Sequence, residues 1–204
     1  MLFNIVIGAT IFATFAMMVR DGLWSNTILL VQVILAGLLA FGFYQPLTVY
    51  IDEKTGGEYT YALDIVILWA IYAVSITLLK VICDALSKTK MKFPEAVDNA
   101  VGPLMGLLAG VVLAGIVGAS LHVTPLPKDG LGGGMDYTGT SVAAAPLYRV
   151  DALWLRMVEA ASSAGLGGGE KFVAQDFVDI YAARRNNYNE ADVEMIRVKR
   201  AAAK

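Results

Sequence analysis

The chain contains very few of the residues on which most catalytic and metal sites depend. Its 204 residues include one cysteine, Cys83, and one histidine, His122. A single cysteine excludes an internal disulfide and every metal pattern that needs several cysteines. A single histidine at a helix end argues against a Ser-His-Asp triad or a histidine metal centre. The sequence therefore predicts no enzymatic activity, no cofactor and no metal site.

Charged residues are also scarce. Asp, Glu, Lys and Arg make up 17% of the chain, compared with about 25% in ordinary soluble domains. The apolar fraction is 57% and the mean hydropathy is +0.60, whereas soluble domains are roughly 45–50% apolar. The net charge of −2 gives no indication of nucleic-acid binding. This composition is typical of a membrane protein.

Four apolar runs are long enough to cross a bilayer, whose hydrocarbon core of about 30 Å needs roughly 20 helical residues. They cover residues 2–19, 27–51, 59–82 and 101–121. A soluble all-α protein of this size could not bury four such runs, so that alternative is disfavoured. The sequence predicts an all-α polytopic membrane protein in which residues 1–122 form a four-helix transmembrane bundle.

The basic residues between these runs predict an orientation. The first run has no basic residue before it and no small-residue cleavage site after it, so we expect a retained anchor and not a cleaved signal peptide. Arg20 follows the first run, and the loop between the third and fourth runs contains Lys88, Lys90 and Lys92. By the positive-inside rule these two loops face the cytoplasm. Both termini then face the periplasm of a bacterial inner membrane.

The fourth run carries a stripe of small residues at intervals of four, which places them on one face of a helix. The stripe consists of Gly102, Gly106, Gly110, Ala114 and Gly118. Helices in lipid approach each other closely at such stripes, because the hydrophobic effect there contributes little to their association. We expect the stripe to pack against the first or second run of the same chain. A homodimer seam and a channel lining are the alternatives.

Asp64 and Lys80 are ionisable residues about one turn inside the two ends of the third run. Contact with water at the membrane interface, or snorkelling of the side chain towards it, is the favoured interpretation for both. The alternative is a polar contact with a partner helix. No chain of acidic groups runs through the bundle, which argues against a proton pump.

The composition changes after the fourth run. Residues 123–145 are rich in glycine and small polar residues and predict a flexible linker. Their glycines lack a preceding strand and a following Lys-Ser/Thr, so a nucleotide site is disfavoured. Residues 146–204 predict an amphipathic helical tail, with Val150, Trp154 and Val158 on its first apolar face. The tail could lie on the membrane surface, dock on the bundle, which we favour, or bind a partner.

Two motifs resemble those of a known family. Asp98, followed by Gly102, Gly106 and Gly110, is similar to the Asp-Arg-x-x-Gly-x-x-x-Gly pattern in the last membrane helix of the colicin V production (CvpA) family. Arg20-x-Gly22 resembles that family's Arg-Gly turn. Two residues depart from the pattern, because Asn99 and Ala109 stand where the family has arginines. The resemblance covers residues 1 to about 122 and, more loosely, 147–161.

The resemblance implies a bacterial inner-membrane protein that is linked to colicin V (toxin) production or export and to envelope homeostasis. It implies no known catalysis, cofactor or transported substrate. We therefore expect a non-enzymatic scaffold or accessory protein in contact with the lipid bilayer. Its partner would be a second copy or another membrane protein, bound through the glycine stripe or the tail. The alternative is a small oligomeric channel or transporter-like conduit.

Overall fold

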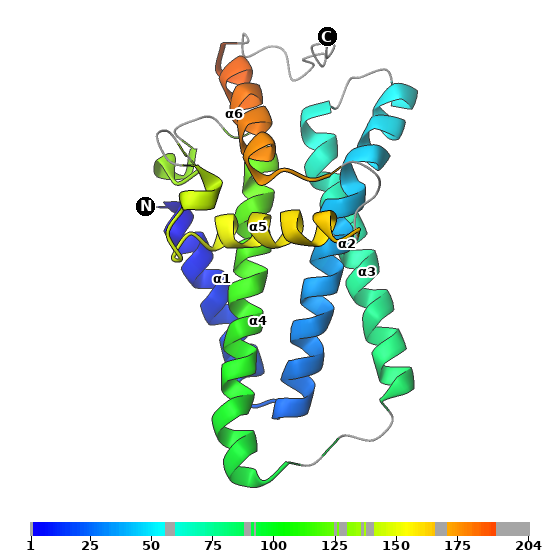
Figure 1. Cartoon of the computed structure of the whole chain (residues 1–204), viewed down its shortest axis with the longest axis vertical. Coiled ribbons are helices and arrows are strands. Elements are labelled where there is room, and N and C mark those ends of the chain that lie inside the picture. Colours follow the sequence, from blue (N-terminus) through cyan, green and yellow to red (C-terminus); the bar gives the residue numbers. More distant parts are fainter. Residues whose placement is uncertain are drawn as a thin grey trace.

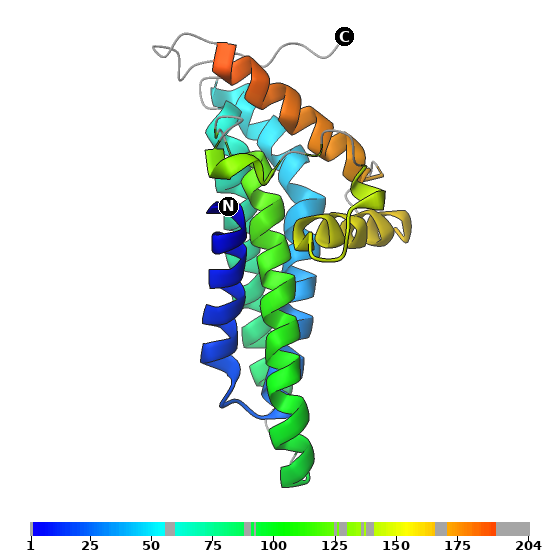
Figure 2. The ribbon, with the colours of Figure 1, turned by 90° about the vertical axis from the view of Figure 1, so that its left-hand side faces the viewer.

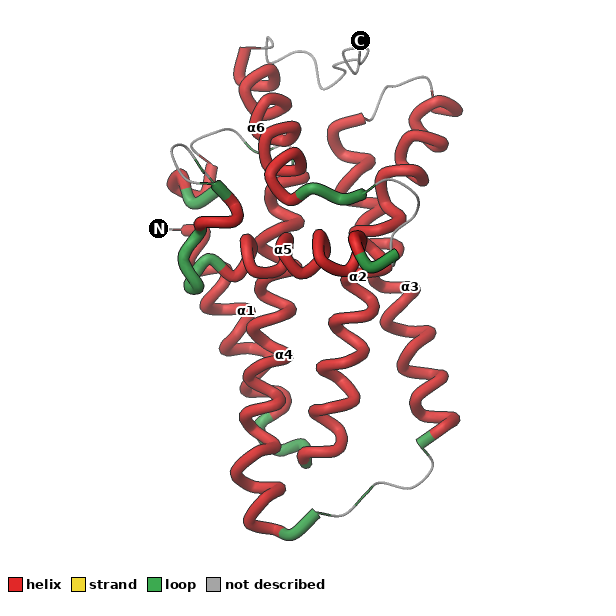
Figure 3. The backbone as a smooth tube through the Cα atoms, viewed as in Figure 1, coloured by secondary structure: helices red, strands yellow, loops and turns green. Residues whose placement is uncertain are grey.

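The computed structural model describes residues 2–55, 60–87, 91, 93–124, 126, 130–135, 137, 141–165 and 171–190. Within these residues the chain forms helices and no strand (Figure 3). The main elements are α1 (Leu2–Met18), α2 (Leu23–Thr55), α3 (Thr60–Leu86), α4 (Glu95–Val123), α5 (Val150–Ser163) and α6 (Ala174–Glu190), with short 3-10 helices η1 (Gly130–Gly133) and η2 (Val142–Ala144). The predicted all-α fold is confirmed.

The helices α2, α3 and α4 extend beyond the apolar runs that predict them, whereas α1 does not. At 1.5 Å per residue, the 33 residues of α2 measure about 50 Å and the 29 residues of α4 about 43 Å. Three helical segments, Leu23–Thr55, Ala62–Leu86 and Glu95–Val123, are long and apolar enough to cross a membrane. The 17 residues of α1 measure about 26 Å, at the lower limit of spanning length. The helices are longer than the runs because helical hydrogen bonding continues into polar residues such as Asp52 to Lys54.

The four long helices run up and down in sequence order, so that the chain has two distinct ends (Figure 1). We call one the turn end: it contains the turn between α1 and α2, at Arg20 to Gly22, and the start of α4. We call the other the tail end: it contains the start of α1 and the end of α4, and α5 and α6 lie there. Lys88, Lys90 and Lys92, on which the predicted orientation depends, are outside the described residues.

The outward faces of the long helices are apolar. Large exposed side chains include Ile5 and Phe12 of α1, Val31, Leu35 and Phe43 of α2, Val66, Val74 and Leu78 of α3, and Leu104 of α4. Contiguous apolar surface of this extent is unfavourable in water but favourable in contact with lipid tails. The exposed faces therefore identify the long helices as the membrane-embedded part of the protein.

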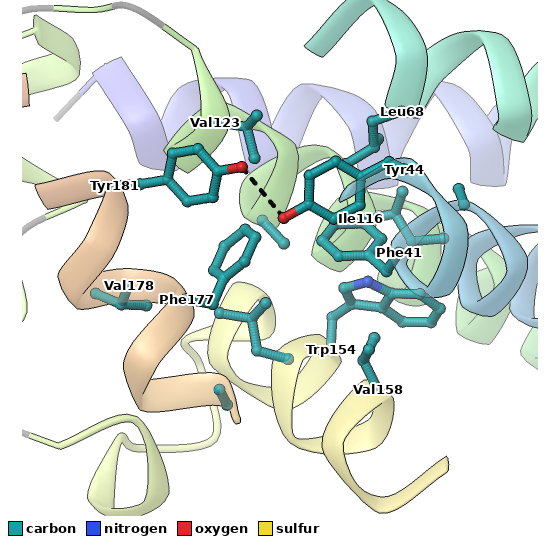
Figure 4. Packing of buried hydrophobic residues seen from close by; sticks show 14 of the residues in the cluster. Phe41, Tyr44, Leu68, Ile116, Val123, Trp154, Val158, Phe177, Val178 and Tyr181 are labelled. Carbon is teal, nitrogen blue, oxygen red and sulfur yellow. Dashed lines mark hydrogen bonds between the residues drawn. The ribbon is translucent and has the colours of Figure 1, made fainter. Parts of the chain in front are cut away.

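The tail helices belong to the main core. α5 lies across α4 and α2 instead of alongside them, and α6 lies beyond it at the tail end (Figure 2). The ring of Phe41 in α2 contacts Trp154 of α5 at a centroid distance of 5.9 Å and Phe177 of α6 at 6.0 Å (Figure 4). Trp154 also packs over Gly37, where a Cβ would lie 2.5 Å from the indole ring. α5 and α6 thus dock on the bundle, the placement favoured from the sequence. Residues 191–204 of the predicted tail are outside the described part.

The segment between the bundle and α5 is partly packed. Met135, Val142 and Ala145 are buried, and a Cβ on Gly134 would lie 2.4 Å from the Cβ of Phe3. Composition alone predicts a flexible linker over 123–145, whereas these described residues are packed against the bundle. The small residues that suggested flexibility permit close approach to α1 and α5.

Candidate functional site

The lower part of the small-residue stripe on α4 faces α1 and the start of α2. A Cβ on Gly102 would lie 3.1 Å from the backbone nitrogen of Leu23, and one on Gly106 would lie 3.0 Å from the Cβ of Met18. A Cβ on Gly110 would lie 3.2 Å from the carbonyl oxygen of Ile11. At these three positions no side chain of α4 separates it from α1 or from the start of α2, so the helices approach each other closely.

The upper part of the stripe faces α1 and α5. Ala114 is fully buried in a small cluster that includes Phe3 and Ile7. A Cβ on Gly118 would lie 3.0 Å from both the Cβ of Asp151 in α5 and the Cδ1 of Ile7. Along its length, then, the stripe is covered by helices of the same chain.

The two family-like motifs meet at the turn end. The backbone N–H of Leu23 donates a 2.7 Å hydrogen bond to Oδ1 of Asp98, which lies 75 residues away in sequence. Leu23 begins α2, where backbone N–H groups lack helical acceptors and a carboxylate is favoured by the helix dipole. A Cβ on Gly22 would lie 3.0 Å from Oδ2 of Asp98, so a side chain there would displace the carboxylate. Arg20 is exposed.

Asn26 reinforces this junction. Its side chain is fully buried. The two N–H groups of Nδ2 are shared among the carbonyl oxygens of Met18 at 3.1 Å, Asp21 at 3.0 Å and Gly102 at 2.8 Å. One amide therefore joins α1, the turn and α4. Sequence reasoning treated Asn26 only as the boundary of the second run. The available signal was the amide side chain of Asn26, which follows Gly22 of the Arg20-x-Gly22 motif by four residues, or one turn of a helix.

At the tail end, Asp64 of α3 is paired with α6. Its side chain is 1% exposed, and Oδ2 accepts hydrogen bonds from Tyr181 at 3.1 Å and from Arg184. The Tyr181 hydroxyl also bonds that of Tyr44 at 3.2 Å (Figure 4). The favoured interpretation of Asp64 as an interfacial, water-exposed residue is wrong. The alternative, a polar contact with another helix, is correct, and that helix lies 120 residues further along the same chain.

A second buried network joins α4 to α5. Nε2 of His122 lies 3.2 Å from Oδ2 of Asp151, to which the Tyr137 hydroxyl donates at 2.7 Å. Arg149 donates from Nε to Oδ1 and from Nη2 to Oδ2, both at 3.2 Å. Nη1 of Arg185 in α6 donates to the carbonyl oxygen of His122 at 2.9 Å. Sequence reasoning gave His122 no such role.

These hydrogen bonds determine the ionisation of Asp151. Burial alone would raise the pKa of its carboxyl group, but the bonds and charges of His122 and Arg149 outweigh burial and hold the pKa well below its ordinary value. Burial and the neighbouring Asp151 carboxylate raise the pKa of Tyr137 above its usual value. Asp151 is thus a buried carboxylate that stays charged because α4 and the segment before α5 supply its donors.

The described residues contain no group of three or more His, Cys, Asp or Glu side chains that could hold a metal ion. Among the described contacts, three carboxylates instead accept hydrogen bonds from other segments. Asp98 joins α4 to α2, Asp64 joins α3 to α6, and Asp151 joins α5 to α4.

Comparison with known proteins gives one match. The family model described as "Colicin V production protein" matches residues 3–151, which is more than half of the chain and includes both motifs at the turn end as well as Asp151. No curated protein and no solved structure matches. Together with the apolar outer faces of the long helices, the match shows that the chain is a membrane protein of the colicin V production (CvpA) family.

Proposed function

We propose that this family member is a non-enzymatic scaffold or accessory protein that supports colicin V production or export and envelope assembly. The observation that carries the proposal is the use made of three acidic side chains, of which Asp64 and Asp151 are buried and Asp98 is partly buried. Asp64, Asp98 and Asp151 each bond a donor from a distant segment. These carboxylates, a side-chain type that can take part in catalysis, therefore serve to hold helices together.

The docked tail supports the same proposal. α5 and α6 share a core with α2, α3 and α4. The surface of the tail end is therefore formed by packed helices. Leu147 and Tyr148, just before α5, are 76% and 80% exposed. Large exposed side chains in a turn next to a docked helix are suited to contact with another protein. We propose that a membrane or envelope protein binds here.

The family and the helix topology support a proposal for the location. We propose the bacterial inner membrane, with the tail end on the periplasmic side. α1 starts at the same end at which α6 lies (Figure 1), so both would share one side. Alkaline phosphatase fused after Lys204 should then be active and a cytoplasm-dependent fluorescent protein dark. The opposite result would reverse the orientation.

A small oligomeric channel is the second candidate. The small-residue stripe on α4 is covered by α1, α2 and α5 of the same chain, which disfavours a pore along it. The apolar outer faces of α2 and α3 are exposed, so helices of other copies could pack against them. A conduit would have to form at that interface between copies.

Purification of the tagged full chain from envelopes in mild detergent tests the proposal. We expect components of the colicin V export or envelope-assembly machinery to remain bound. Replacement of both Leu147 and Tyr148 by serine should release them, whereas replacement of the exposed Met91 at the turn end by serine should not. A homo-oligomer without partners that gives discrete currents in planar bilayers would overturn the scaffold in favour of the channel.

A further inference from the structure

The helix α5 crosses the bundle at a level that can be measured along two other helices. Trp154 of α5 packs against Gly37 of α2 and Gly115 of α4, where an added Cβ would lie 2.5 Å and 3.0 Å from its side chain. Along α2, the rise from Leu23 to Gly37 is about 21 Å at 1.5 Å per residue. Along α4, the rise to Gly115 from Gly102, which lies against Leu23, is about 20 Å. Both helices therefore place α5 about 20 Å from the turn end, measured along the bundle.

Exposed charges mark where the hydrocarbon core of the membrane begins at the turn end. Arg20 and Asp21, in the turn between α1 and α2, are exposed, and so is Asp84 near the end of α3. The Trp24 indole N–H donates to the Ser87 hydroxyl at 3.1 Å, which places this end of α3 beside the start of α2. Charged side chains are costly in hydrocarbon. The core therefore begins at the start of α2 or further into the bundle.

The side of α5 that faces the tail end is polar. A cavity of about 190 Å³ between α2, α5 and α6 is lined in part by Lys171 and Asp176, and both side chains are exposed. Arg156 of α5 donates to the carbonyl oxygens of Ala143 at 3.2 Å and Ala145 at 3.4 Å, in and next to η2. These charged groups need water or lipid headgroups around them. A flat hydrocarbon core of about 30 Å that begins at the turn end would instead enclose them.

The side of α5 that faces the turn end is apolar. The backbone N–H of Phe172, just before α6, donates a 2.9 Å hydrogen bond to the Ser162 hydroxyl, so Ser162 faces the tail end. At about 3.6 residues per turn, residues two positions before and after it lie on nearly the opposite side of the helix. They belong to an apolar face with intervals of three and four residues. This face consists of Leu153, Met157, Ala160 and Ala164. The two alanines are exposed, and the two larger residues are half-buried.

The surface of α4 between α5 and the turn end continues this apolar face. Leu108 and Leu104 come seven and eleven residues before Gly115, a spacing that places all three on one side of α4. The two leucines are 41% and 50% exposed. Because Gly115 lies against α5, they lie between α5 and the turn end, on the lipid-facing surface of the long helices. We call these two leucines and the apolar face of α5 together the step.

We propose that acyl chains of the leaflet at the tail end fill the step, so that the hydrocarbon core is thinned to about 20 Å beside α5. α5 then lies along the membrane surface, with its apolar face on the acyl chains and its polar side in water, as amphipathic interfacial helices do. A bilayer accommodates such a mismatch in thickness at modest cost.

The thinning is confined to one side of the molecule. Where α2 borders α3, exposed apolar side chains continue past the level of α5 to Leu47, which lines a groove with Ile71 of α3. The hydrocarbon core keeps its ordinary thickness of about 30 Å there. The chain therefore indents one leaflet beside α5 only. This inference depends neither on the proposed scaffold function nor on which side of the membrane the tail end faces.

Spin labels on the full chain in dioleoyl phosphatidylcholine vesicles test the proposal. Cys83 is the only cysteine, so Cys83→Ser gives a background for single labelled cysteines. Ala160→Cys and Ala164→Cys carry a nitroxide on the apolar face of α5, and Ser163→Cys carries one at an exposed position beside it. We expect the labels at 160 and 164 to be more accessible to oxygen than to a water-soluble nickel chelate, and the label at 163 to show the reverse order. Val74→Cys, at a 66% exposed position on α3, is the reference for acyl chains.

Two outcomes would overturn the proposal. If all three labels on α5 match the acyl-chain reference, α5 is immersed in a core of ordinary thickness and the bilayer is not thinned. If all three are more accessible to the nickel chelate, the membrane ends before it reaches α5 and lipid does not fill the step. The labelled positions are exposed, so unchanged melting temperatures exclude misfolding as the cause of either result.

Discussion

The two ends of the helix bundle are held together in different ways. At the turn end, Gly102 lies against the backbone of Leu23, and Gly22 and Gly106 leave no room for a side chain of their own. Asp98 and Asn26 bond backbone atoms there. At the tail end, side chains from distant segments bond each other, as Asp64 does with Arg184 and Asp151 with His122. Both ends are therefore sensitive to added volume, because Gly37 at the tail end also packs closely against Trp154. The tail end is in addition sensitive to the loss of a charge from its buried pairs.

The largest effect is expected from added volume at the turn end. Gly106→Leu places a side chain where a Cβ alone would lie 3.0 Å from Met18. We expect a loss of about 3 kcal/mol or more in the free energy of unfolding, the upper part of the range for overpacking. Thermal unfolding in detergent measures it. Gly8→Leu is the matched control, because a Cβ on Gly8 meets nothing within 4 Å. Equal stability of the two variants would refute close packing at the stripe.

Loss of charge at the tail end should come next. Arg184→Gln leaves the buried Asp64 without its cation, which costs about 3 kcal/mol when one partner of a buried pair is removed. α6 should loosen, as limited proteolysis and thermal unfolding would report. Asp179→Asn, an exposed change on α6, should have no effect. The double variant Asp64→Asn with Arg184→Gln should recover part of the loss. If the double variant is no more stable than Arg184→Gln, the unpaired Asp64 carboxylate is not the cause of the stability loss in Arg184→Gln.

A smaller loss of stability is expected from removal of the Asp98 carboxylate at the turn end. Asp98→Ala removes the acceptor for the Leu23 N–H and should lower stability by about 1–2 kcal/mol, as the loss of a helix cap does. Asp84→Ala changes an exposed carboxylate at the same end and serves as the control. Equal melting temperatures for Asp98→Ala and the unmodified chain would rule out a stabilising role for this bond.

The smallest effect concerns pH. Because the folded protein holds the pKa of Asp151 below its ordinary value of about 3.9, this group stabilises the fold above that pH. The stabilisation is lost as pH falls towards the folded pKa, on the order of 1 kcal/mol per pH unit. Melting temperatures between pH 6 and pH 3 measure the loss. Asp151→Asn should be less stable near neutral pH and should show a flatter profile. Parallel profiles would mean that other groups cause the acid sensitivity.

Much of the turn end could be predicted before its geometry was known. The four-residue spacing of Gly102, Gly106 and Gly110 is a local pattern, and helical geometry places its members on one face. Asp98 and Gly22 were singled out by resemblance to the family motifs. Their mutual contact was not predicted, nor was the role of Asn26. A lone amide at the edge of an apolar run has no periodicity that would indicate its partners.

The tail end was predicted less well. The sequence indicates an amphipathic tail, but not that Arg184 reaches Asp64 or that Tyr137 and Arg149 reach Asp151. Asp64 near a helix end resembles any residue at a membrane interface. Its burial depends on whether α6 covers it, and no local pattern contains that information.

The sequence by itself determined that the protein is helical, that it lies in a membrane and where its close-packed helix face is. Hydropathy, segment length and four-residue spacing carry that information, because each depends only on neighbouring residues. Only the tertiary structure decided which helices cover the stripe, that the tail is part of the core and which buried charges are paired. Those features depend on contacts between segments up to 137 residues apart, and such contacts form only once the whole bundle brings the partners together.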